Sequence, residues 1–120
     1  MRNVLKYRRI NQLNYKKMNT TETKIEIKTI DVNAKEWFDK VNGNSYFAAN
    51  VTLNYGMEDC KNIILPFQYG YGDSYRYAAA KKLHELGFTN YDNLYQIQET
   101  GIIVRSNIQR NCKQRELKNI

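Results

Sequence analysis

Hydrophobic and polar residues alternate most regularly between Ser45 and Tyr55. The hydrophobic positions lie two residues apart and are Phe47, Ala49, Val51, Leu53 and Tyr55. The residues between them are mostly polar or small. Because successive side chains of a strand point to opposite faces, this pattern predicts an antiparallel strand with one buried face and one solvent-facing side.

A second alternation begins at Lys24 and places Ile25 and Ile27 on one side of an extended chain. From Ile30 onward the hydrophobic residues change face. This change predicts a bulge or a register change near Asp31.

Asn42 and Gly43 follow that segment, and Asn-Gly supplies the two positive φ angles of a type I′ hairpin turn. An alternative is a short helix capped by Asn33 and Glu36 that ends at Gly43. We favour the hairpin.

Residues 63–69 alternate again and predict a third strand. Pro66 lacks an N–H to donate, so this strand is expected at a sheet edge or to be bulged there. A helix is expected to begin at Asp73 or Ser74, and Gly87 is the natural residue just past its end. Its predicted hydrophobic stripe consists of Tyr75, Ala79, Leu83 and Leu86.

The remainder predicts a short helix within residues 91–99 and a strand that starts at Ile102 and extends toward Ile108. Residues 110–118 form a basic end, expected to be solvated. The predicted fold is α+β: an antiparallel β-meander of three strands plus a C-terminal strand, packed on one face by one main helix and a short second helix.

The net charge of +7 lies entirely in the two terminal segments. Residues 1–20 hold six basic and no acidic residues, residues 21–100 have a net charge of −3, and residues 101–120 a net charge of +4. We therefore expect residues 1–18 to be a basic N-terminal extension, disordered or not native, since Met18 is a plausible start. Residues 19–120 are expected to form a single domain with a basic C-terminal end.

Basic residues and exposed aromatic rings are the candidates for contact with nucleic acid or a protein partner. The basic candidates all come from the C-terminal segment and are Arg105, Arg110, Lys113 and Arg115. The aromatic candidates are Trp37, Tyr69, Tyr71 and Tyr75. For Trp37 and Phe38, adjacent on a strand, one side chain must face the core and the other outward.

No motif in the chain predicts catalysis, a metal site or a cofactor. The lone His84 has no histidine partner, and the acidic residues lack a diagnostic spacing. Gly70 and Gly72 precede a helix, but Asp73 would repel a phosphate there, so a tight turn is the simpler interpretation. Cys60 and Cys112 are expected to be free thiols. No hydrophobic run reaches the roughly 18 residues that a membrane helix needs.

Two segments, Trp37–Tyr46 with the pattern WF-K-NGN-Y and Pro66–Asp73 with the pattern P-F-YGYG, carry a resemblance to known proteins. They resemble segments of small uncharacterised proteins encoded by bacteriophages and prophages, over roughly residues 24–88. The resemblance implies an accessory viral protein acting in the cytoplasm of a bacterial host. It implies no catalytic residues.

Two functions remain open at this point. The first is a non-enzymatic accessory protein that binds nucleic acid or a nucleoprotein complex. The second is a protein-binding inhibitor of a host factor, such as a CRISPR effector or another anti-phage defence enzyme.

Overall fold

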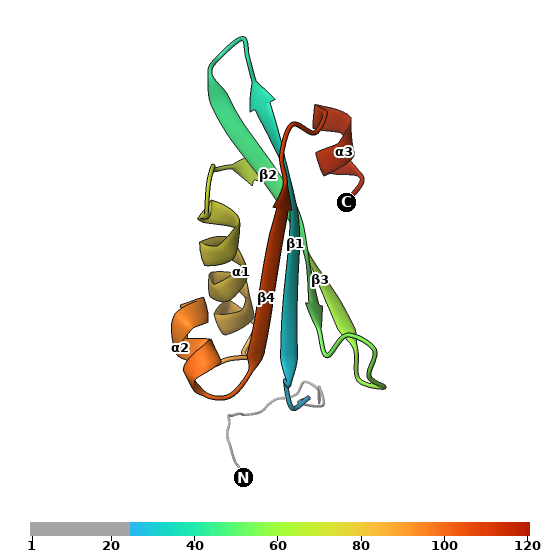
Figure 1. Ribbon diagram of the computed structural model, residues 1–120, viewed down its shortest axis with the longest axis vertical. Helices are drawn as coiled ribbons and strands as arrows, with labels where there is room; N and C mark the ends of the chain where they lie inside the picture. The colour runs from blue at the N-terminus through green and yellow to red at the C-terminus, as the bar shows by residue number, and fades with distance from the viewer. Residues whose placement is uncertain (1–24) are drawn as a thin grey trace.

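The computed structural model describes residues 25–120, which form one four-stranded sheet with three helices. The strands are β1 (Thr29–Asp39), β2 (Asn44–Leu53), β3 (Lys61–Tyr69) and β4 (Ile103–Gln109). Their order across the sheet is β3-β2-β1-β4 (Figure 1). The α+β class, the antiparallel meander of three strands (β1, β2 and β3) and the C-terminal strand are confirmed. β4 pairs parallel to β1, so the complete four-stranded sheet is mixed.

The β1–β2 hairpin is confirmed, but two of its predicted details are wrong. The register runs without interruption from Ile30 opposite Leu53 to the end of the hairpin, so there is no bulge near Asp31. The turn is a four-residue loop organised by Asp39, whose Oδ1 accepts hydrogen bonds from two backbone N–H groups of the loop, at 3.0 and 3.3 Å. Only Gly43 in this loop has a positive φ, so the turn is not type I′.

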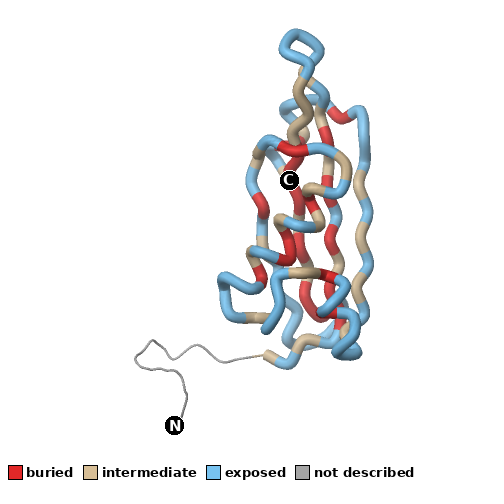
Figure 2. The backbone as a smooth tube through the Cα atoms, turned by 90° about the vertical axis from the view of Figure 1, so that its left-hand side faces the viewer, coloured by how far each residue is buried: buried red, intermediate tan, exposed pale blue. Residues whose placement is uncertain are grey.

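One face of the sheet is covered by α1 (Ser74–Glu85) and α2 (Leu94–Glu99). The predicted hydrophobic side of β2 faces these helices, and four of its five members, Phe47, Ala49, Val51 and Leu53, are at most 2% exposed. Leu83 of α1 and Ile97 of α2 pack on them. The fifth, Tyr55, was wrongly predicted to be buried: β2 ends at Leu53, and Tyr55 is 71% exposed in the loop that follows. Figure 2 shows the buried positions along the strands; in β2 the residues between them are the buried Ala48 and the half-buried Asn50 and Thr52. Transfer of this apolar surface out of water is the main source of stability.

The C-terminal end of α1 matches the expectation from Gly87. Gly87 has a φ of 85°, its N–H donates to the carbonyl of His84, and the N–H of Phe88 donates to the carbonyl of Leu83. This pair of bonds is a Schellman motif, and it satisfies carbonyls that the helix leaves unpaired. Asp73 is the N-cap as expected, although its side chain makes no capping bond.

β3 is an edge strand, as Pro66 predicts, and its register with β2 shifts beside Pro66. The glycines that follow form the tight turn into α1. A Cβ on Gly70 would lie 2.7 Å from Cε1 of Phe47 and 2.8 Å from Cβ of Ser74, so only glycine fits.

The basic C-terminal end is not a solvated tail. It forms a further helix, α3 (Gln114–Lys118), on the face of the sheet opposite α1 and α2 (Figure 1). Leu117 is 1% exposed and packs with Ala48 and Cys112, which holds the helix on β1, β2 and β3. The helices therefore cover both faces rather than one. In residues 25–120, no helix is long and apolar enough to cross a membrane.

Candidate nucleic-acid interface

Among residues 25–120, no element other than α3 covers the sheet face opposite α1 and α2, and this face presents rows of polar side chains. Asn33 of β1 is paired with Asn50 of β2 and with Asn107 of β4, which gives a row of three amides. The neighbouring row places Asp31 between Thr52 and Arg105. We call this surface the open face; its members are Asp31, Asn33, Lys35, Asn50, Thr52, Asn62, Ile64, Arg105 and Asn107.

Arg105 is held in position on the open face by a bidentate ion pair. Its Nε and Nη2 donate to the two carboxylate oxygens of Asp31, at 2.6 and 3.0 Å. The hydrogen bond and the charge of Asp31 raise the pKa of the guanidinium above its already high value. A guanidinium carries five N–H donors. Because this ion pair uses only some of them and the side chain is 57% exposed, donors remain for a phosphate or a base.

The amide row contains an unpaired acceptor. Oδ1 of Asn50 is buried and has no hydrogen-bond partner among residues 25–120. A buried polar atom without a partner usually indicates a water or another group bound beside it. This oxygen is enclosed by the surrounding residues, so it is not itself presented at the surface of the open face.

Aromatic rings border the open face at the end near α3. The ring centroids of Trp37 and Tyr46 lie 5.5 Å apart, and those of Tyr46 and Phe67 lie 5.0 Å apart, both stacked. Tyr69 meets Tyr46 edge-on at 5.9 Å and is 64% exposed. We call these four residues the aromatic cluster. Nζ of Lys118 lies 5.6 Å from the Phe67 ring, so α3 adds a cation beside it.

Cations gather at this end of the molecule. Lys113, Arg115 and Lys118 belong to α3 or its N-cap and are exposed, and no ion pair joins them to another described residue. Arg110 donates from Nη1 to Oε1 of the buried Glu36 at 2.8 Å, and its side chain is 52% exposed, so it also keeps donors that this ion pair does not use. The basic C-terminal charge therefore lies beside the open face.

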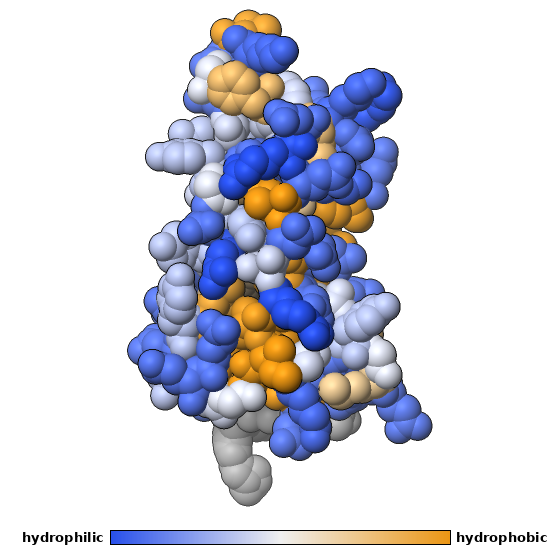
Figure 3. All heavy atoms as spheres, in the orientation of Figure 1, coloured by the Kyte–Doolittle hydropathy of each residue, from blue (hydrophilic) through white to orange (hydrophobic). Residues whose placement is uncertain are grey.

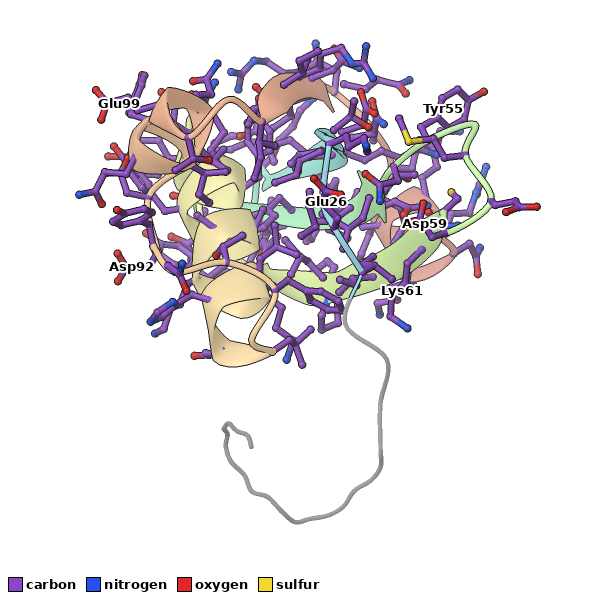
Figure 4. All side chains as sticks on the ribbon, turned by 90° about the horizontal axis from the view of Figure 1, so that it is seen from below. Glu26, Tyr55, Asp59, Lys61, Asp92 and Glu99 are labelled. Atoms are coloured by element: carbon purple, nitrogen blue, oxygen red, sulfur yellow. The ribbon has the colours of Figure 1, made fainter. Side chains whose placement is uncertain are left out.

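Acidic side chains are spread over the opposite end. Figure 4 looks at that end and shows Glu26, Asp59, Asp92 and Glu99 distributed around it, from different segments and without a common focus. Among residues 25–120, no group of three or more potential ligands could hold a metal ion.

The structure brings some of the predicted contact residues together and separates others. Arg105, Trp37 and Tyr69 share the open face or its border. Tyr71 is 69% exposed, in the turn before α1. Tyr75 is 5% exposed in the core, so it is not a contact residue; its place in the hydrophobic stripe of α1 explains its burial. Of the adjacent aromatic pair, Phe38 is the outward residue, at 49% exposure.

The sequence analysis did not identify the row of three amides or Lys35 as candidate contact residues. Their only signal was the polar side of β2, where Asn50 and Thr52 alternate with core residues. The matching residues of β1 and β4 could not be aligned with them, because the strand order and the parallel pairing of β4 do not follow from the alternation.

Comparison of the chain with protein-family models, with curated proteins and with solved structures finds no match in any of the three.

Proposed function

We propose that this protein binds single-stranded nucleic acid on the open face and is a binding protein rather than an enzyme. The observation that carries the proposal is the position of α3. The basic C-terminal segment folds onto the same face as the row of three amides, so cations suited to phosphates and amides suited to base edges share one surface.

Each kind of side chain on this surface has a role in such binding. Lys35, Arg105 and the cations of α3 suit backbone phosphates, which supply most of the affinity. The amides of Asn33 and Asn107 offer donors and acceptors to base edges, and exposed Tyr69 offers a ring for stacking. A sheet face of this kind suits unpaired bases, because bases within a duplex do not expose their faces.

The resemblance of Trp37–Tyr46 and Pro66–Asp73 to phage proteins supports a bacterial host cytoplasm as the place of action. Nucleic acid there includes replicating phage DNA, transcripts and the nucleoprotein complexes of host defence.

A protein-binding inhibitor of a host factor, such as a CRISPR effector or another defence enzyme, is the second candidate. It is favoured by exposed tyrosines on α1 and α2, on the face of the sheet opposite α3. Tyr77 and Tyr95 are 64% and 65% exposed, and the Arg76 guanidinium lies 5.4 Å from the Tyr95 ring. Exposed aromatic residues beside an arginine are typical of protein-binding hot spots.

Fluorescence anisotropy with a labelled single-stranded oligonucleotide tests the proposal in the complete chain. The affinity of Lys35→Gln and of Lys118→Gln is measured from about 50 to 200 mM salt. Because the slope of log K against log salt is negative, each variant is expected to make it less steep, by about 0.7 in magnitude. Lys81→Gln on α1 is the matched control, because it removes the same charge from the opposite side, and its slope should stay unchanged.

Three results would contradict the proposal: binding that does not respond to salt, equal slopes in all three variants, or no binding at all. If binding depends on salt but neither Lys35→Gln nor Lys118→Gln changes the slope, the contact would be assigned to the basic residues 1–20 instead. A host protein that stays bound after nuclease treatment, with Tyr77→Ala releasing it, would favour the second candidate.

A further inference from the structure

β4 forms an edge of the sheet that is regular and uncovered by any described element. Figure 1 shows it nearest the viewer, with α1 and α2 on one side and α3 on the other. The opposite edge, β3, is interrupted at Pro66, whereas β4 contains no proline and pairs regularly with β1 over seven residues. Natural proteins usually protect such edges, because an exposed edge is a template for another strand.

The backbone groups of alternate β4 residues point away from the sheet. The N–H of Ile103 donates to the carbonyl of Lys28 at 3.1 Å, so Ile103 and every second residue after it pair with β1. The N–H and C=O groups of Val104, Ser106 and Ile108 must then point outward. Among residues 25–120, no other segment accepts or donates a backbone bond there.

We propose that the β4 edge pairs antiparallel with the β4 edge of a second copy of this chain, with Ser106 opposite Ser106. In this register the outward-pointing residues of the two copies exchange hydrogen bonds in pairs, with Val104 opposite Ile108 of the second copy. Arg105 then faces Asn107 of the second copy, so no like charges oppose each other.

One of the two neighbouring registers is disfavoured by charge. Shifting the strands by two residues to pair Val104 with Ser106 would put Arg105 directly opposite Arg105, which is unfavourable. Hydrophobic surface also lies along this edge. Figure 3 shows hydrophobic side chains at the surface over the lower half of β4, and Ile103 is 55% exposed.

The pairing has a consequence for the shape of the assembly. Residues opposite each other in antiparallel strands point to the same face. The two open faces would therefore join into one surface, and Arg105 and Asn107 of both copies would lie at its centre. The proposal does not depend on what the open face binds.

Sedimentation velocity over a range of protein concentrations tests the dimer in the complete chain. Asn107→Arg places an arginine opposite Arg105 twice, by the two-fold symmetry, and is expected to raise the dissociation constant of the dimer about tenfold. Asn107→Asp places a carboxylate there and is expected to lower it. Asn62→Arg is the matched control, because it adds the same charge to the same face on β3, and it should leave the dimer unchanged.

Asn62 and Asn107 are both exposed, so circular dichroism and melting should show that all three variants keep the fold. A chain that stays monomeric at every concentration would overturn the proposal. So would a dimer that responds equally to the arginine substitutions at 107 and at 62, because the β4 edge would then not be the interface.

Discussion

Asn54 is a buried polar side chain whose loss should destabilise the domain. It follows β2, has a φ of 55° and is fully buried. Its Oδ1 accepts hydrogen bonds from the N–H groups of Lys28 at 2.7 Å and Thr29 at 3.3 Å. Its Nδ2 donates to the carbonyl of Glu26 at 2.9 Å. One side chain therefore fastens the segment before β1 to the end of β2.

The substitution Asn54→Ala removes all three bonds and leaves their backbone partners unsatisfied. Each bond contributes about 1 kcal/mol net, so the loss is about 3 kcal/mol. Alanine also tolerates a positive φ less well than asparagine, which adds a fraction of a kcal/mol. Since a domain of this kind has a total stability of about 5–15 kcal/mol, the change should be large.

Urea unfolding monitored by the fluorescence of Trp37, the only tryptophan of the chain, measures this loss. Asn62→Ala is the control, because it removes an exposed side-chain bond to Thr52 and should cost less than about 0.5 kcal/mol. Hydrogen exchange at the amides of Lys28 and Thr29 should accelerate in Asn54→Ala alone. A loss below about 1 kcal/mol, or equal losses in both variants, would refute the reasoning.

Two further predictions concern the turns. Gly70→Ala should destabilise the domain by about 1–3 kcal/mol more than Gly43→Ala, because its Cβ meets Phe47 at 2.7 Å whereas nothing lies within 4 Å at Gly43; equal midpoints in urea would contradict this. The pKa of Asp39 lies below its ordinary value of 3.8, and the largest cause is the side-chain hydrogen bond from Asn42. The Asp39 carboxylate therefore stabilises the turn above pH 3.8, and this stabilisation is lost as the pH falls through the lowered pKa. An NMR titration should find the midpoint below 3.8, and Asn42→Ala should raise it.

Patterns among neighbouring residues were enough to predict β2 and the end of α1. The alternation along β2 predicted its buried side, and Gly87 predicted the end of α1. The hairpin loop shows where a local signal was read wrongly: Asn-Gly suggested a two-residue turn, but the Asp39 carboxylate accepts the loop N–H groups and stabilises a longer loop.

α3 and the direction of β4 could not be predicted because both depend on contacts far apart in the sequence. α3 has a single fully buried hydrophobic residue, Leu117, so it shows no helical periodicity. It packs on Ala48, Trp37, Tyr46 and Phe67, which come from β1, β2 and β3. The open face could not be predicted for the same reason, because its row of three amides forms only when β1, β2 and β4 pair in the observed register.

The central claim is that the open face binds single-stranded nucleic acid, and an NMR titration of the complete chain tests it most directly. The side-chain amides of Asn33, Asn50 and Asn107 are followed while an unlabelled single-stranded oligonucleotide is added at low salt. We expect their signals and the backbone signals of α3 to shift together, while the outer surfaces of α1 and α2 stay unchanged. Shifts confined to residues 1–20 or to the helical side would contradict the claim.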